Sequence, residues 1–567
     1  METPKGPDRP ERDREDAAIE ADAALAADAA LREAEAFDPG EEFGGEATPG
    51  RQAGKIARST AFFSVATAAS RVAGLAREVV AAGYYGVSGP MSAFTTAFLV
   101  PNLVRALFAD AALQPAFVPV FTDLIGKKQY REAFRLASTL MLLVTMVLGA
   151  ITALFVLIAP VVIPLFAPGF EGELLDLTVS LSQVLFPILI VLGLSGVVVG
   201  ILNSYDRFGA FAISPLAWNL TIILVLVVLE PRFHGQDRIY AYAIGILIGT
   251  LVQLLIPAFD LRNTPFKFSW SFDWRHPGVR RVLLLMLPVT LSLGLINFNQ
   301  AINNLFATLV SDEAPAAIEK AFRIYQLPQG IFSVAIATVL FPTLARFANR
   351  GAIDDLRATM ANGMRQILFV LVPAAAAILA LSEPMIRLIY QRGAFDAAQT
   401  TLVATALFWF AFSLPTNGLY LLQTRTFFSL QRPWMAAQLA VIDLVVSALA
   451  ALVLYSPFGV GGIVAGTGIG TTATVFTQAY ILRREFGGLE LGRLWSTAAR
   501  ITVAAAALAG VGWVVWDVLD QALGRDLIDQ IVSLGAGLGA GLVAYLAVAK
   551  LLRIAELEQI VRLLRRR

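Results

Sequence analysis

Residues 69–80 read ASRVAGLAREVV and place three charged side chains inside an otherwise apolar run. The run extends over residues 59–86, which exceeds the roughly 20 residues that a helix needs to cross a bilayer. A charged group at that depth costs several kcal/mol unless it is paired or faces water. The stretch therefore predicts a membrane helix with one face toward a polar interior, and other parts of the chain must supply the remaining walls.

The composition of the whole chain agrees with a membrane location. Of the 567 residues, 57% are hydrophobic and only 15% are charged, and the mean hydropathy is +0.68. Strand-type alternation is absent, so a helical bundle is favoured over a barrel. The sequence predicts an all-α polytopic membrane protein with about fourteen transmembrane helices, at residues 59–85, 90–112, 134–160, 175–202, 208–229, 239–261, 279–310, 316–345, 360–382, 399–424, 433–455, 458–482, 496–517 and 528–552.

The distribution of basic residues in the connections predicts the topology. Lys and Arg concentrate in every second connection, around residues 127–135, 262–281, 346–357 and 483–500. The intervening connections are poor in them, although two carry a pair of arginines each. By the positive-inside rule, both termini are expected in the cytoplasm.

An internal repeat predicts two lobes. Pro160 matches Pro384 and Gly169 matches Gly393, each pair being 224 residues apart. An even number of spans in each half makes the repeats parallel, with a ligand site expected at their interface. We expect two six-helix lobes related by pseudo-two-fold symmetry plus two C-terminal helices. The predicted boundaries are an acidic, disordered cytoplasmic extension at 1–55, an N-terminal lobe at 56–262, a C-terminal lobe at 263–485, and the last two helices with a basic tail at 486–567.

Charged residues recur within three predicted spans. In the first, Arg71 and Glu78 are seven residues apart and share a helix face, whereas Arg77 points about 120° away. The other charged residues are Arg105 and Asp110 in the second span, and Glu319, Lys320 and Arg323 in the eighth.

Two interpretations of these charges remain open. Arg77 with Glu78, Arg105 with Asp110 and Arg323 with Glu319 can form structural ion pairs. Alternatively, the arginines line a cationic central cavity for a phosphorylated ligand, since guanidinium groups bind phosphate oxygens through several donors.

Further polar and glycine-rich features lie in later spans. The seventh span contains the polar run INFNQAINN (296–304) with Asn297 and Asn299, and Asp443 stands alone in the eleventh. Asp443 is a candidate for cation or proton coupling, or it bonds a neighbouring helix. The glycine-rich residues 459–473 are expected to serve helix packing. We find no catalytic cluster and no metal site, so a transporter is expected rather than an enzyme.

Four segments resemble a known family: SRVAGLARE (70–78), FLVPNLVRALFADAALQPAFVPVF (98–121), ILNSYDRFGAFAISP (201–215) and RIYQLPQGIFSVAIATVLFPTLARF (323–347). They are similar to the MurJ (MviN) lipid II flippases of the multidrug/oligosaccharidyl-lipid/polysaccharide exporter superfamily. The resemblance implies fourteen helices in two six-helix lobes plus two. It also implies alternating access that moves an undecaprenyl-pyrophosphate-linked peptidoglycan precursor to the outer leaflet.

The resemblance also implies roles for individual residues. Those that match the family's essential cavity arginines, and so are expected to bind substrate, are Arg71, Arg77, Arg105 and Arg323. Those expected to support or gate the site are Glu78, Asp110 and Ser92, with Ser92 standing where the family usually has Asp. Asn297 and Asn299 are expected to do the same on the ground of the polar run itself.

The expected function is therefore flipping of a lipid-linked precursor of peptidoglycan in cell-wall biogenesis. Alternatives are an exporter of another lipid-linked oligosaccharide or small molecule with this fold, or a non-transporting scaffold for cell-wall assembly. Expected partners are the undecaprenyl-pyrophosphate-linked substrate, membrane lipids and cell-wall synthesis proteins, with no nucleic acid. No cofactor is expected; Na⁺, H⁺ or the membrane potential can supply the driving force.

Overall fold

The computed structural model describes residues 49–108, 113–270, 272–489 and 491–558. The chain divides into two compact units, residues 1–62 and 63–567. Most of the predicted acidic extension, residues 1–48, lies outside the described residues. In the first unit only the beginning of one helix, residues 49–62, is described. The following description concerns the second unit.

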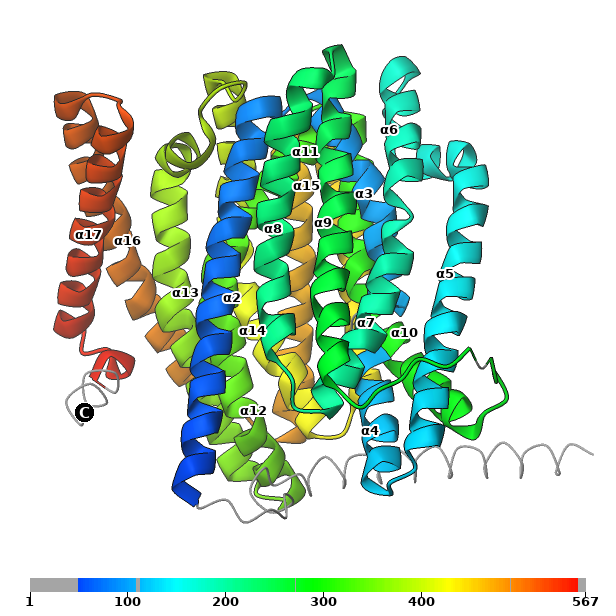
Figure 1. Cartoon of the computed structure of the whole chain (residues 1–567). Coiled ribbons are helices and arrows are strands. Elements are labelled where there is room, and N and C mark those ends of the chain that lie inside the picture. Colours follow the sequence, from blue (N-terminus) through cyan, green and yellow to red (C-terminus); the bar gives the residue numbers. More distant parts are fainter. Residues whose placement is uncertain (1–48, 109–112, 271, 490, 559–567) are drawn as a thin grey trace, which may run out of the picture. The chain divides into compact units, whose positions relative to one another are not determined.

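Helices account for nearly all of the described chain (Figure 1). No strand occurs among the described residues, which confirms the predicted all-α class. The helices are α2 (Pro49–Tyr85), α3 (Gly89–Phe108), α4 (Leu113–Gly126), α5 (Tyr130–Phe166), α6 (Gly172–Leu185), α7 (Ile188–Ser204), α8 (Gly209–Leu229), η1 (Glu230–Arg232), η2 (Gly235–Arg238), α9 (Ile239–Asp260), η3 (Leu261–Asn263), α10 (Pro277–Val310), α11 (Ala314–Pro328), η4 (Gln329–Ser333), α12 (Val334–Asn349), α13 (Ile353–Tyr390), α14 (Ala397–Ser429), α15 (Pro433–Glu485), α16 (Leu491–Leu523) and α17 (Leu527–Leu551).

Ten helical segments of the described chain are long and apolar enough to cross a membrane. They include the continuous runs α6–α7 and α11–α12, each of which matches one predicted span. α2, α3 and α10, which match the first, second and seventh predicted spans, are not among the ten. The membrane-protein class is confirmed, and the count of fourteen spans stays a prediction.

The longest helix, α15, consists of two antiparallel helices that meet at Gly459. This glycine has φ +55° and ψ −132°, a left-handed conformation that breaks the helix. Glycines at four-residue spacing then face the first half: a Cβ on Gly462 would collide with the carbonyl of Leu454, and one on Gly466 would lie 2.6 Å from the amide nitrogen of Ala451. Two packed helices thus occupy the places of the predicted spans at 433–455 and 458–482, and the packing role of the glycine-rich segment is confirmed.

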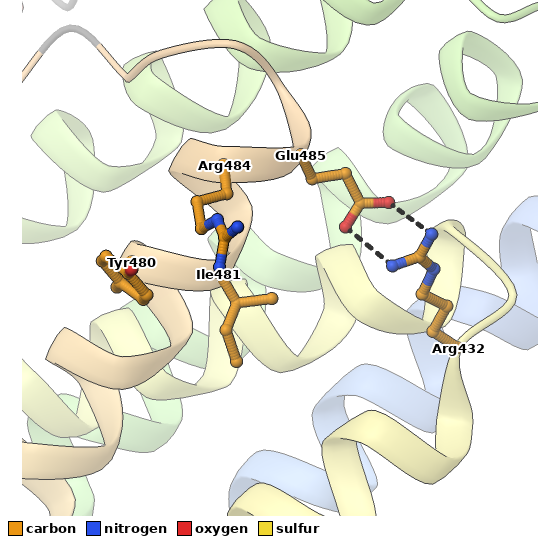
Figure 2. Close-up of a pocket in the computed structure, with 5 residues that line it drawn as sticks. All are labelled: Arg432, Tyr480, Ile481, Arg484 and Glu485. Atoms are coloured by element: carbon orange, nitrogen blue, oxygen red, sulfur yellow. Dashed lines mark hydrogen bonds and ion pairs between the residues drawn. The ribbon is translucent and has the colours of Figure 1, made fainter.

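An ion pair joins the two ends of this hairpin (Figure 2). Arg432 precedes α15 and Glu485 is its last residue, yet two contacts of 3.1 and 3.2 Å connect the guanidinium and the carboxylate. The pair lines a pocket of about 340 Å³ together with Tyr480, Ile481 and Arg484. Such a bidentate contact fixes the two helices of the hairpin relative to each other.

Two spans are interrupted next to prolines. α6 and α7 are separated by Phe186 and Pro187. α11 ends at Pro328, and the following five residues, η4, form a π-helix before α12 continues the span. A π-helical turn inside a longer helix leaves backbone groups less regularly bonded and often marks a functional site.

Close contacts join the predicted halves at one end of the bundle. We call this the upper end, where α2 stops and α3 begins; it lies at the top of Figure 1. The amide of Ala394 donates to the carbonyl of Gly83 over 2.8 Å, and the amide of Ala316 donates to Ser92 Oγ over 3.2 Å. The upper end is therefore held shut by hydrogen bonds from backbone amides to segments far apart in sequence.

The last two helices, α16 and α17, pack against each other and against α13 (Figure 1). A buried ion pair connects Arg387 of α13 with Asp520 of α16. A second connects Arg365 of α13 with Glu556, which follows α17, over 3.0 Å. α13 is thus the helix to which α16 and α17 are attached. The predicted domain boundaries within residues 63–567 stay a prediction, since these residues form one compact unit.

Candidate functional site

A cavity of about 1140 Å³ lies within the bundle. Its walls come from α2, α3, α7, α8, α9, α10, α11, η4, α14 and α15. The first five of these elements belong to the predicted N-terminal lobe and the others to the C-terminal lobe. The cavity therefore lies where the repeat predicted a ligand site.

Two adjacent charged residues of α2, Arg77 and Glu78, line the cavity. Each is only 8% exposed, and Arg77 Nη2 donates to Glu78 Oε1 over 2.5 Å. The Arg77 guanidinium also lies over the ring of Trp218 on α8, 4.6 Å from its centroid, where the π face favours a cation. The predicted Arg77–Glu78 ion pair is confirmed.

Arg71 does not line the cavity with the other two charged residues of this segment. We expected Arg71 and Glu78 on one face and Arg77 on another. Instead, Ser70, Arg77 and Glu78 line the cavity, whereas the side chain of Arg71 is exposed and is not part of the lining. Ser70 and Arg77 are also seven residues apart and therefore share the face toward the cavity, and Glu78, the ion-pair partner of Arg77, lines the cavity as well. A substrate role for Arg71 stays a prediction.

The opposite charged wall belongs to α11. Arg323 Nη2 lies 2.6 Å from Glu319 Oε1, and both residues line the cavity. This confirms the predicted i,i+4 pair, a spacing that places side chains side by side on a helix. The structure thus combines both interpretations left open by the sequence, because the arginines form ion pairs and also face the cavity.

The sequence reasoning noted Lys320 but did not assign it a role in the site. Its side chain is 1% exposed, with Nζ 4.0 Å from Glu78 Oε2 and 5.3 Å from the centroid of the Tyr390 ring. It lies behind the cavity lining rather than in it. Its neighbours one turn away, Ala316 and Ile324, are also buried, so helical spacing was the signal that could have shown its burial.

Arg105 contributes a third guanidinium to the lining, from α3. It donates to Asn102 Oδ1 through Nη2 over 2.7 Å and through Nε over 3.0 Å. Its predicted partner, Asp110, lies outside the described residues. Arg105 is therefore oriented by a neighbouring amide one turn away.

Ser92 lies at the upper end and not in the cavity lining. It is completely buried, and its hydroxyl accepts the hydrogen bond from the Ala316 amide in the first turn of α11. That amide has no carbonyl partner within its own helix. Ser92 thus connects α3 to α11 immediately above the charged wall.

A polar cluster connects α10 with α15 on another side of the cavity. Asn303 Nδ2 donates to Asn299 Oδ1 over 3.2 Å, and Thr467 Oγ1 donates to Asn303 Oδ1 over 3.0 Å. Asp443 is part of the same wall and has the side chains of Asn299 and Thr471 beside it. The side chain of Asn297 is outside what the structure describes.

The described charges of the lining are balanced. Three arginines face three carboxylates, which are Glu78, Glu319 and Asp443. The carboxylates are unevenly placed, since Asp443 lies on α15 and the two glutamates lie beside arginines on α2 and α11. Lys320, behind the wall, adds the one positive charge in excess at the α2–α11 side.

Solved structures share this architecture. One of a lipid II flippase MurJ in an inward closed conformation has a TM-score of 0.72 with 21% sequence identity, covering 86% of this chain and 98% of that one. An inward-facing MATE family transporter of the MOP superfamily has a TM-score of 0.61 with 17% identity, covering 74% and 94%. At these identities the likeness concerns the fold alone.

Sequence comparisons give the family. The chain is 31% identical over 500 residues to a probable lipid II flippase MurJ of Rhizobium meliloti (strain 1021), covering 85% of this chain and 91% of the relative. It is 27% identical to the lipid II flippase MurJ of Burkholderia cenocepacia, covering 71% and 79%. The family model described as lipid II flippase MurJ matches residues 81–525. The chain therefore belongs to the lipid II flippase MurJ family.

Proposed function

We propose that this multi-pass inner-membrane protein is a lipid II flippase, which moves an undecaprenyl-pyrophosphate-linked saccharide from the inner to the outer leaflet. Family membership supports this reaction. The observation that carries it in this chain is that Arg77 of α2 and Arg323 of α11, from different predicted lobes, face one cavity. A pyrophosphate group cannot enter hydrocarbon unaided, because burying an isolated charge costs tens of kcal/mol in the Born limit.

The arginines exchange partners when substrate arrives. In this structure Arg77 is paired with Glu78 and Arg323 with Glu319, which compensates the desolvation of the four groups. Each guanidinium has five N–H donors, so it can donate hydrogen bonds to phosphate oxygens while keeping or releasing its carboxylate. Arg105, oriented by Asn102, supplies a third contact from α3. The lipid tail stays in the bilayer while the headgroup occupies the cavity.

The charge of the connections gives the orientation of the bundle in the membrane, on which the direction of transport depends. The basic connections, such as those between α4 and α5 and between α12 and α13, lie at the end opposite the upper end (Figure 1), and the positive-inside rule makes that end cytoplasmic. Both ends of the chain then lie in the cytoplasm. The contacts at the upper end close the outer side in this conformation, and rocking of the lobes breaks them to release the substrate outward.

Asp443 is the proposed coupling site. It is the carboxylate on the α10–α15 wall, with Asn299 and Thr471 beside it. Oxygen ligands of this kind suit Na⁺, and a lone intramembrane carboxylate also suits a proton. We expect Asp443→Asn to abolish the dependence of flipping on a Na⁺ or pH gradient while substrate binding is kept.

Reconstitution in liposomes tests the proposal. Purified full-length chain should flip a pyrophosphate-linked lipid, and Arg77→Ala or Arg323→Ala should reduce the rate at least tenfold. Arg350→Ala is the matched control, because Arg350 is an exposed residue after α12. The same variants should fail, and the control succeed, in restoring growth to cells depleted of their lipid II flippase. Normal flipping by both cavity variants would overturn the proposal.

A further inference from the structure

The α2–α11 wall forms a compact group of five charged residues. We call it the upper cluster: Arg77, Glu78, Glu319, Lys320 and Arg323. Arg77, Lys320 and Arg323 all lie close enough to Glu78 to interact with its carboxylate. The cluster connects the predicted lobes, since Glu78 is on α2 and Lys320 is on α11.

The charge of the upper cluster depends on one residue. Without Lys320, two arginines face two glutamates at 2.5 and 2.6 Å, and the cluster is neutral. A neutral wall offers an anion no net attraction to offset the loss of its hydration shell. Lys320 raises the formal charge of the cluster to +1. The arginines supply the donors that contact phosphate, whereas the surplus charge comes from a residue behind the lining.

Lys320 lies near Glu78, but its surroundings leave the hydrogen-bonding capacity of its ammonium group unused. Nζ lies 4.0 Å from Glu78 Oε2, longer than a hydrogen bond, and has no hydrogen-bond partner among the described residues. The Tyr390 ring faces it at 5.3 Å. A buried ammonium with so few contacts is costly for folding, so its presence at 1% exposure needs a reason other than stability.

We propose that Lys320 is a positioning residue for substrate: it neutralises Glu78, and Arg77 thereby keeps an uncompensated charge for the pyrophosphate. This inference rests on the proposed flippase function. When phosphate oxygens approach Arg77, Glu78 shifts from the guanidinium toward the ammonium and closes the 4.0 Å gap. Because this contact spans the two lobes, substrate binding also tightens the α2–α11 connection below the upper end.

A charge ladder at the upper cluster tests the proposal. The probe is a polyprenyl pyrophosphate titrated into the detergent-solubilised full chain, with the uncharged polyprenol as reference. The formal charge of the cluster is +2 in Glu78→Gln, +1 in the wild type and in the double variant E78Q/K320M, and 0 in Lys320→Met. We expect affinities in that order, with K320M about 10- to 100-fold weaker than the wild type, as one charge several ångström away predicts at an effective dielectric of about 20.

Two further variants separate charge from packing. Lys320→Arg keeps the charge and should stay within about threefold of the wild type, and Lys127→Met removes an exposed lysine far from the cavity and should change nothing. If K320M does not fold, the comparison of E78Q with E78Q/K320M carries the same test, because adding K320M should again weaken binding at least tenfold.

The outcomes distinguish this inference from the proposed function. A wild type that binds the pyrophosphate no better than the polyprenol contradicts the flippase proposal itself. A wild type that discriminates, together with a folded K320M of equal affinity, overturns only the role of Lys320. A folded double variant that stays as weak as K320M would show that Lys320 acts through packing, and would also overturn it.

Discussion

Gly169 and Gly393 occupy equivalent places at the upper end, each against the backbone of the first helix of the opposite half. A Cβ on Gly169 would collide with the carbonyl of Thr308 at the end of α10, and one on Gly393 with the carbonyl of Gly83 at the end of α2. Gly83 and Thr308 are 225 residues apart, almost the 224 that separate the two glycines. Each half of the repeat thus places an equivalent glycine against the end of the first helix of the other half.

A methyl group at either glycine should open the upper end. Overpacking of a tight contact typically costs about 1–3 kcal/mol, so Gly169→Ala is expected to shift the protein toward the outward-open conformation. Gly169→Ala is the cleaner variant, because Gly393 also has a positive φ of 59° that alanine disfavours. The chain has no cysteine, so spin labels at Glu171→Cys and Ala398→Cys can report the distance across this end.

The control for this measurement is Gly539→Ala. Gly539 lies within α17, and a Cβ there would meet no atom within 4 Å. The label distance should increase in Gly169→Ala and stay unchanged in Gly539→Ala. Equal distance distributions in both variants would contradict a sealing role for the glycine contacts.

Acid should stabilise the closed upper end through Glu313. Partial burial, followed by the nearby carboxylates of Asp396 and Asp312, raises the pKa of Glu313 above its ordinary value of 4.5. A raised pKa means that the folded protein binds this proton more tightly than the unfolded chain does, so the associated stability is lost as pH rises through the raised value. Glu313 is therefore expected to contribute a fall in the thermal midpoint as pH rises from 4.5 toward neutrality.

Glu313→Gln removes this contribution. Its thermal midpoint should depend less steeply on pH over the same interval and should exceed that of the wild type at neutral pH. Glu171→Gln, an exposed glutamate at the same end, serves as the comparison. A Glu313→Gln protein with an unchanged pH profile would contradict the raised pKa of Glu313.

The buried ion pair between Arg387 and Asp520 should be needed to hold α16 and α17 against α13. Their side chains are 10% and 7% exposed, and removing one partner of a buried pair typically costs about 3–5 kcal/mol because the other charge is left uncompensated. Asp520→Asn is therefore expected to lower the thermal midpoint by several degrees, and Asp517→Asn, one turn earlier in α16, to lower it much less. Similar midpoints for the two variants would refute this role.

The α15 hairpin should not tolerate a large side chain at its glycine seam. At Gly466 even a Cβ would lie 2.6 Å from the Ala451 amide nitrogen, whereas at Gly535 of α17 it would meet nothing within 4 Å. Gly466→Leu is expected to abolish stable expression in the membrane, and Gly535→Leu to be tolerated. Detergent-solubilised yield and size-exclusion profiles provide the measurement.

Much of the architecture was determined by the sequence alone. Long apolar segments define helices that must satisfy their own backbone in lipid, so the helix class and the hairpin around Gly459 could be predicted. The arginines of the cavity walls could also be recognised, because a charge such as Arg77 or Arg323 inside an apolar run requires a polar surrounding.

Only the tertiary structure decided which of these charges meet. Helical periodicity gives the angle between Arg71, Arg77 and Glu78 on one helix, but not which face turns toward the cavity. The distance between Glu78 and Lys320 depends on the packing of α2 against α11, which are more than 200 residues apart in sequence. Electrostatic energy falls with distance and rises with burial, so the balance of charge in the cavity is a property of that packing.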